Sequence, residues 1–163
     1  MRIWGDEGGS VSFAAPTPAG TDAETALTWI VDVPELEAQL DQALSFAPQV
    51  HWLDAPEDAA LTVICEGRAS VSRAGLGVEY ASTPYGQTAV ATRLLCERPH
   101  QGIACQWFRD HEILGVLPLP DLPEDTPQQA GRRVAVVWSV PPARATELCT
   151  SDPADFTAAL QAA

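Results

Sequence analysis

The longest strand candidate of the chain reads QTAVATRLLCE and spans Gln87 to Glu97. Successive side chains of a strand point to opposite faces of a sheet, so this run presents two faces. One face carries Val90, Thr92, Leu94 and Cys96, and the other carries Ala89, Ala91, Arg93 and Leu95. The run therefore predicts a sheet strand around which the neighbouring segments must be arranged.

Several other segments predict strands. Arg133–Val140 is rich in Val, Ala and Trp, and this pattern predicts a strand buried on both faces. Ile103–Phe108 and Ile113–Leu117 predict two strands joined by a short turn. Arg2–Trp4 and Val11–Phe13 predict a hairpin, because the Gly-rich stretch between them has turn chemistry. Shorter apolar runs predict further strands at Leu27–Val31, Val50–Leu53 and Leu61–Cys65.

Helices are predicted early and late in the chain. Leu36, Leu40 and Leu44 form an apolar stripe at helical spacing, which Asp32 precedes as an N-cap and Pro48 ends. A short helix is expected from Pro142 to Cys149. A last helix is expected after Asp152, which caps it with Pro153 at the first position and with Phe156, Ala159 and Leu160 on its apolar face. Arg68–Ala74 predicts a short helical turn.

These elements predict an α+β fold with a mainly antiparallel β-sheet and helices packed on one side. Pro16–Asp22 and the Pro-rich, acidic Pro118–Gly131 segment are expected to be loops. With 163 residues, the chain has the length of one domain, and residues 1–163 are expected to form it.

The composition narrows the possible partners. The formal net charge is −13, and all nine basic residues are Arg, so a nucleic-acid partner is not expected. No apolar run approaches the ~20 residues of a membrane span. The N-terminal residues do not resemble a signal peptide, so a cytoplasmic location is expected.

The four cysteines, Cys65, Cys96, Cys105 and Cys149, are expected to be free thiols, since none forms a C-x-x-C pair. Cys96, His100 and Cys105 have a spacing that fits no compact zinc module, so no metal site is predicted. The dinucleotide fingerprint, the Walker loop, the HExxH motif and the GxSxG motif are all missing from the sequence. No catalytic group is predicted from spacing alone.

Five short motifs that follow one another along the chain give more specific information than composition and spacing. They are YGQTAV at 85–90, CERPH at 96–100, QWF at 106–108, LGVLPLP at 114–120 and VVWS at 136–139. This succession resembles the middle region of the ubiquinone-biosynthesis FAD monooxygenases, relatives of para-hydroxybenzoate hydroxylase. That family has Tyr-Gly-Gln, Glu-Arg-Pro-His, Gln-x-Phe, Leu-Leu-Pro-Leu and Val-Trp-Ser in the same order. The resemblance extends over most of the chain, from Met1 to about Leu160.

The segment ICEGRASVSR at 64–73 is similar to the Asp-Gly motif of that family. The resemblance implies cofactor-binding roles for Glu66, Gly67 and Arg73. It implies an aromatic substrate pocket lined by Gln106, Trp107, Phe108, Leu117 and Trp138. The alternative for Trp107, Phe108, Leu117 and Trp138 is ordinary core packing, and for Gln106 it is pairing with backbone at a strand edge. For Glu66 and Arg73 the alternative is an exposed or mutually paired surface.

The resemblance implies FAD and NAD(P)H in the complete enzyme and an aromatic or prenylated phenol as ligand. Departures accompany the resemblance. Glu66 stands where the family has Asp, and Val33-Pro34 stands where it has Asn-Arg. The flavin-holding Rossmann half has no counterpart in this sequence, so FAD is not expected to bind this chain alone.

Two functions follow as hypotheses. The first is the substrate-binding portion of an FAD-dependent monooxygenase that hydroxylates an aromatic ring, in the cytoplasm or peripheral to the inner membrane. Its partner would be a flavin-binding half. The second is a non-enzymatic ligand-binding or assembly protein derived from that domain, in which the exposed surface promotes a homodimer.

Overall fold

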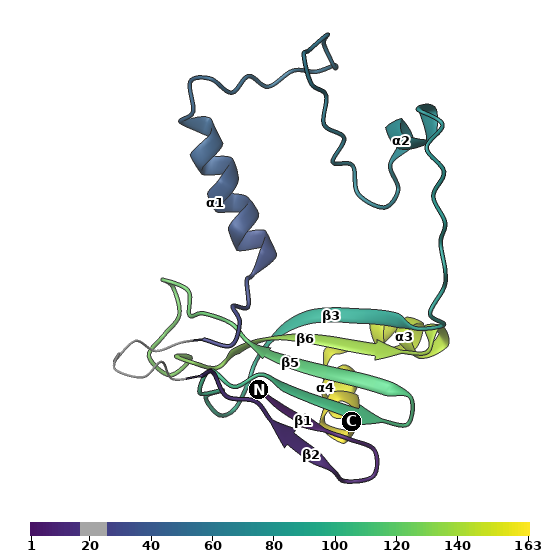
Figure 1. Ribbon diagram of the computed structural model, residues 1–163. Helices are drawn as coiled ribbons and strands as arrows, with labels where there is room; N and C mark the ends of the chain where they lie inside the picture. The colour runs from purple at the N-terminus through teal and green to yellow at the C-terminus, as the bar shows by residue number, and fades with distance from the viewer. Residues whose placement is uncertain (17–25) are drawn as a thin grey trace. The chain divides into compact units, whose positions relative to one another are not determined.

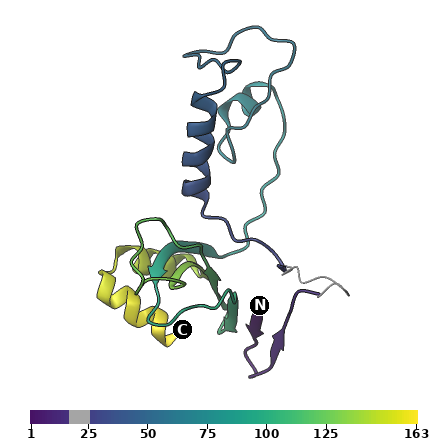
Figure 2. The same cartoon turned by 90° about the vertical axis from the view of Figure 1, so that its left-hand side faces the viewer.

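The protein forms a six-stranded sheet with the strand order β2-β1-β4-β5-β6-β3. The computed structural model describes residues 1–16 and 26–163. The strands are β1 (Arg2–Trp4), β2 (Ser10–Ser12), β3 (Thr88–Leu95), β4 (Cys105–Arg109), β5 (Glu112–Pro118) and β6 (Arg133–Val140). All pairings are antiparallel except that of β1 with β4. Two helices, α3 (Pro142–Thr150) and α4 (Pro153–Ala162), lie on the same side of the sheet (Figures 1 and 2). The α+β prediction is confirmed.

The hairpin between β4 and β5 has a two-residue turn. Asp110 and His111 both have positive φ, at 49° and 66°, which is the pattern of a type I′ turn. This turn matches the twist of the flanking strands and holds the register in which Arg109 faces Glu112. The Gln87 side chain donates a hydrogen bond of 2.7 Å to the His111 carbonyl, which ties the start of β3 to the turn.

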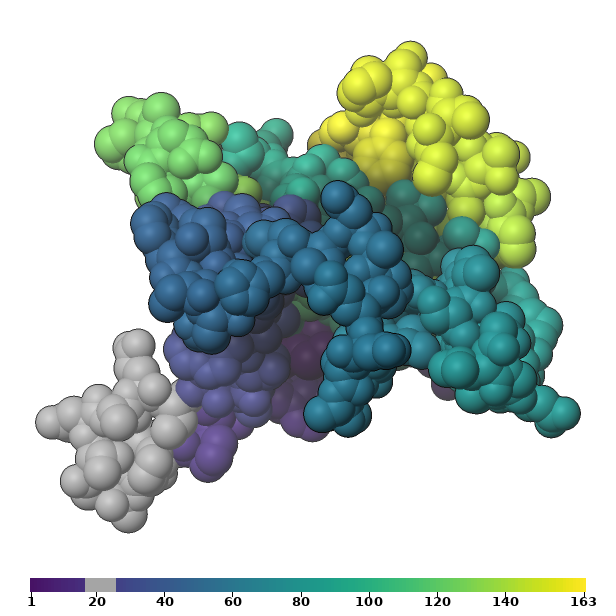
Figure 3. Space-filling model, turned by 90° about the horizontal axis from the view of Figure 1, so that it is seen from above, coloured from purple at the N-terminus to yellow at the C-terminus, as the bar shows by residue number. Residues whose placement is uncertain are grey.

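The chain divides into two compact units. Unit 1 comprises Met1–Leu36 and Gly86–Ala163, and unit 2 comprises Glu37–Tyr85. Helix α1 (Val33–Ser45) crosses the boundary, and α2 (Val71–Gly75) lies within unit 2. The ribbon between α1 and α2 follows an extended course (Figure 1), and the atoms of this segment are blue to teal in the space-filling view (Figure 3). The expectation of one domain over residues 1–163 remains a prediction.

Three predicted strands are wrong. Leu27–Val31, Val50–Leu53 and Leu61–Cys65 have no strand geometry, and Trp29 in the first of them is 84% exposed. A short apolar run becomes a strand only when a neighbouring strand accepts its backbone hydrogen bonds. Among the described residues these runs find no such neighbour. Much of the predicted loop Pro16–Asp22 lies outside the described residues.

The helices agree better with their predictions. Helix α1 begins directly after Asp32, whose carbonyl accepts the Leu36 amide at 3.0 Å. The Asp152 side chain accepts the Ala154 and Asp155 amides, as an N-cap should. The turn predicted at Arg68–Ala74 is α2. No helix of the described residues is both long and apolar enough to cross a membrane.

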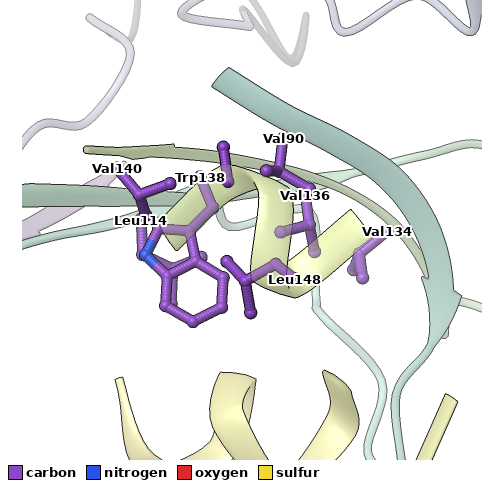
Figure 4. Packing of buried hydrophobic residues seen from close by; sticks show 8 residues of the cluster. Val90, Leu114, Val134, Val136, Trp138, Val140 and Leu148 are labelled. Atoms are coloured by element: carbon purple, nitrogen blue, oxygen red, sulfur yellow. The ribbon is translucent and has the colours of Figure 1, made fainter. Parts of the chain in front are cut away.

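The hydrophobic core lies between the sheet and helices α3 and α4. It comprises Val90, Leu114, Val134, Val136, Trp138, Val140, Ala145 and Leu148 (Figure 4). Phe156, Ala159 and Leu160 of α4 pack against this cluster, as the predicted apolar face of the last helix requires. We call this side of the sheet the covered face.

The prediction that β6 is buried on both faces is wrong. Val134, Val136, Trp138 and Val140 are buried, whereas Val137 between them is 38% exposed. β6 is central, with β5 and β3 beside it, but both pairings are antiparallel. An antiparallel sheet can leave one face to solvent, and an apolar run alone does not distinguish this case from a parallel strand.

Truncating a side chain in the core and one on the opposite face of the sheet should lower the unfolding free energy by different amounts. Leu148→Ala removes a side chain that is 4% exposed against the core, and we expect it to cost about 2–5 kcal/mol of unfolding free energy. Val137→Ala on the opposite face should cost about 1 kcal/mol or less. Urea unfolding followed by tryptophan fluorescence measures both, and equal losses would contradict the assignment of the core to one face.

Candidate functional site

The face of the sheet opposite the core is the first candidate surface. Directly paired residues share a face, so the strand registers assign its members. We call it the open face; it carries Ala89, Ala91, Arg93, Gln106, Phe108, Ile113, Gly115, Leu117, Ala135, Val137 and Ser139. Near its centre the small residues Gly115 and Ala135 lie beside Val137 and Leu117. A surface with little side-chain bulk leaves room for a flat ligand to lie on the strands.

The structure divides the five predicted substrate residues between the two faces. Gln106, Phe108 and Leu117 lie on the open face, and Phe108 is exposed. Trp107 and Trp138 lie on the covered face, because they pair across the strands with the buried Leu114. The five residues therefore do not line one surface.

Trp138 is held by packing and by one hydrogen bond. Its side chain is 2% exposed, and its ring meets Phe156 edge-on at a centroid distance of 6.4 Å. The indole Nε1 donates to Glu112 Oε2 at 2.9 Å. A buried indole with its one donor satisfied is a structural element of the core.

Trp107 is less buried than Trp138. It stacks on Trp4 with ring centroids 4.9 Å apart and planes 7° from parallel. Trp107 and Trp138 face a cavity of about 210 Å³, which is also lined by Arg109, Glu112 and Arg144. Sequence reasoning missed Arg109 and Arg144. Only their positions could have pointed to them, Arg109 at the end of a strand and Arg144 near the start of a helix.

A second cavity of about 230 Å³ lies on the open face. Its lining is mostly apolar and includes Val31, Pro34, Ala91, Ala135 and Val137. The segment before α1 thus forms one wall, although it is not the strand that the sequence predicted. Pro34, which departs from the resembled family, belongs to this wall.

An ion-pair network fixes that segment at the edge of the cavity. Asp32 Oδ1 lies 2.7 Å from Arg93 Nη2, and Asp32 Oδ2 lies 3.6 Å from Arg133 Nη2. Arg133 also approaches Asp125 at 3.8 Å. Oδ1 of Asp32 is buried and has no aligned hydrogen-bond donor, so the charge of Arg93 compensates it. A buried Asp32 carboxylate without these arginines would lower the stability of the fold. The ion pairs therefore hold residues 31–34 against β3 and β6.

The predicted cofactor residues Glu66, Gly67 and Arg73 lie together in unit 2. Glu66 Oε2 accepts the Ser70 hydroxyl at 2.8 Å and the Ser72 amide at 3.1 Å, and Oε1 accepts the Ser72 hydroxyl. The hydrogen bonds from Ser72 and Ser70 lower the pKa of Glu66 from 4.5 to about 2. Ser70 in turn caps α2 by accepting the Arg73 amide.

Arg73 is also engaged within its own turn. Its Nη2 donates to the Arg68 carbonyl at 2.8 Å, and its guanidinium lies 4.2 Å from the centre of the Tyr80 ring. The cavity beside Glu66, Gly67 and Arg73 measures about 180 Å³, whereas sites for drug-sized ligands measure roughly 300–1,000 Å³. These residues therefore do not fit FAD as a complete site, and no chemical step is assigned to them.

Other titratable groups offer little chemistry. Burial raises the pKa of the Cys96 thiol, and it also raises that of Cys105, so neither is an activated nucleophile. Within residues 1–16 and 26–163, no three His, Cys, Asp or Glu side chains are grouped to hold a metal ion.

Comparison with known proteins gives a distant and partial similarity. No family model matches the chain. It is 32% identical to the ubiquinone hydroxylase UbiL of Rhodospirillum rubrum over 81 residues, which is 50% of this chain and 17% of that protein. It is 30% identical to the uncharacterized protein slr1300 of Synechocystis over 101 residues, which is 62% of this chain and 22% of that protein. The matches thus span about a fifth of these curated relatives, and the similarity indicates a relation to the ubiquinone hydroxylases without finer detail.

The Glu66 turn has a testable pH dependence. The folded pKa is depressed, so the stabilisation is present above the ordinary value of 4.5 and is lost as the pH falls through about 2. We expect the Ser72 amide resonance to titrate with a midpoint near pH 2, and Glu66→Gln to abolish that titration. A midpoint near 4.5 in the parent chain would show that the carboxylate is not held by these serines.

Proposed function

We propose that this chain is the substrate-binding portion of an FAD-dependent monooxygenase that hydroxylates an aromatic ring, with a ubiquinone precursor as substrate. The observation that carries the proposal is the open face, where small side chains leave a shallow floor between Phe108, Leu117 and Gln106. The partial similarity to a ubiquinone hydroxylase supports the same reading.

The open face supplies the interactions that an aromatic substrate needs. A phenol ring lies over Gly115 and Ala135, where little bulk opposes it, and its edge meets Phe108. The Gln106 side chain offers a donor and an acceptor to a ring oxygen. The apolar cavity beside Val31, Pro34 and Val137 receives the prenyl group, which gains by leaving water.

Oxygen activation in the complete family enzyme comes from FAD reduced by NAD(P)H, and the protein supplies binding and orientation. Glu66 and Arg73 are engaged in hydrogen bonds within their own turn, which supports a flavin site built mainly by other residues. The proposal therefore requires a flavin-binding half as partner. A prenylated substrate partitions into membranes, so we place the chain in the cytoplasm, peripheral to the inner membrane.

One observation favours the second candidate, a non-enzymatic ligand-binding or assembly protein derived from this domain. Glu66 stands at the position of the family's Asp, and its carboxylate is occupied by Ser70 and Ser72 rather than free for a cofactor. Under this function the open face would still bind an apolar ring, but no flavin-dependent turnover would follow when a flavin-binding half is supplied.

Two titrations of the whole chain test the proposal. FAD, followed by fluorescence quenching and thermal shift, should show no saturable binding at high micromolar concentration. The short prenylated phenol 2-prenylphenol, followed by calorimetry, should bind saturably. Phe108→Ala should weaken that binding by up to about tenfold, since an aromatic contact is worth roughly 0.5–1.5 kcal/mol.

Phe46→Ala is the matched control, because Phe46 is an exposed phenylalanine of unit 2 and should leave the affinity unchanged. Saturable, stabilising FAD binding would overturn the requirement for a separate flavin-binding half. Absence of phenol binding, or equal losses in the two variants, would remove the open face as the substrate surface.

A further inference from the structure

Arg93 brings a positive charge to the open face. It pairs with Ala135 across β3 and β6, and the Cβ atoms of directly paired residues lie about 5 Å apart on one face of a sheet. Its side chain is 46% exposed and lines the cavity that Ala135 and Val137 also border. The guanidinium therefore lies beside the floor on which the proposed substrate ring rests.

Asp32 holds the Arg93 guanidinium at one of its nitrogens. Arg93 Nη2 lies 2.7 Å from Asp32 Oδ1, and the Asp32 side chain is 9% exposed. A guanidinium also carries N–H donors on its other two nitrogens. Within residues 1–16 and 26–163, Nη1 and Nε of Arg93 have no hydrogen-bond partner. A half-exposed cation is thus fixed in place with donors left for a ligand.

The nearby Arg133 is not available in the same way. It lies on the same side of β6 as Ala135, but its side chain is 14% exposed. It approaches Asp32 Oδ2 at 3.6 Å and Asp125 at 3.8 Å, so two carboxylates compensate its charge. Arg93 has only Asp32, which it shares with Arg133. A bound anion would supply the second carboxylate that Arg93 lacks.

We infer that Arg93 is a specificity-determining residue of the open face and selects an aromatic substrate that carries a carboxylate. The inference rests on the proposed function, in which a ring lies over Gly115 and Ala135. A carboxylate on that ring accepts two N–H groups of the planar guanidinium, which a neutral phenol oxygen does not match. The substrate class is thereby narrowed from prenylated phenols to prenylated hydroxybenzoates.

The overall charge makes this contact decisive for an acidic ligand. The chain carries a formal charge of −13, so it repels a carboxylate at long range. Salt screens charges more than about 8 Å away at physiological ionic strength, and the nearest cation then dominates the local field. Without Arg93 the repulsion would remain uncompensated, and the preference for an acid over a neutral ligand should disappear.

A matched set of ligands tests the inference on the whole chain. Two of them, 4-hydroxy-3-prenylbenzoate and its methyl ester, share the ring and the prenyl group but differ in charge. Calorimetry at physiological ionic strength should show the acid binding at least about fivefold more tightly than the ester, because an ion pair at a half-exposed side chain contributes modestly. The third ligand, 2-prenylphenol, lacks the carboxyl group and should bind like the ester.

A double variant tests the residue. Arg93→Gln combined with Asp32→Asn removes both charges together, so no buried carboxylate is left unpaired and the net charge stays at −13. The variant should bind the acid no more tightly than the ester. The readout is the ratio of the two affinities, so a general loss of binding does not imitate the result. Dispersed NMR resonances of β3 and β6 verify that the variant is folded.

Glu97→Gln combined with Arg98→Gln is the matched control, because both residues are exposed and the net charge again stays at −13. This control should keep the preference for the acid. Equal affinities for acid and ester in the parent chain overturn the role of Arg93 and leave the open face as the substrate surface. A preference that survives in the Arg93 variant, or one that is also lost in the control, overturns that role as well. Absence of binding by all three ligands overturns the proposed function together with the inference.

Discussion

The Trp138 indole lies at the centre of the core on the covered face of the sheet, and the strands and helices of unit 1 pack around it. The indole is buried between Val90 of β3 and Leu114 of β5, and Phe156 of α4 meets its edge. Its Nε1 is satisfied by Glu112, so no buried donor is left without a partner. One side chain thereby joins three strands to the last helix.

This arrangement determines which face can serve a ligand. Alternate residues of β6 point away from the core, and Ala135, Val137 and Ser139 form part of the open face. The same strand thus supplies the core with every second residue and a shallow floor with the others. The Asp32 ion pairs with Arg93 and Arg133 then place an apolar wall at the edge of that floor.

Sequence reasoning succeeded where the local pattern determines the structure. The alternation in residues 87–97 predicted how the side chains of β3 divide between two faces, and Asp152 with Pro153 predicted the start of α4. It failed at Leu27–Val31 and Leu61–Cys65, because a strand needs a partner strand and an apolar run does not reveal whether one exists.

The candidate site was only partly predictable for the same reason. The motif that contains Gln106, Trp107 and Phe108 lies on β4, which contributes to the open face. Neighbours along a strand point to opposite faces, so Trp107 points away from Gln106 and Phe108. The predicted cofactor residues Glu66 and Arg73 lie in one turn, yet their bonds to Ser70, Ser72 and Arg68 depend on the local backbone, which the sequence pattern does not specify.

The central claim is that the open face, and not the Trp138 face, receives an aromatic ligand. Methyl-resolved NMR of the chain with 2-prenylphenol separates the two faces, because their methyl groups alternate along β6. The account predicts shifts of the Ala91, Ala135 and Val137 methyl resonances and unchanged resonances for Val134, Val140 and Leu148. Shifts at the latter three, together with the Trp138 indole N–H, would contradict it.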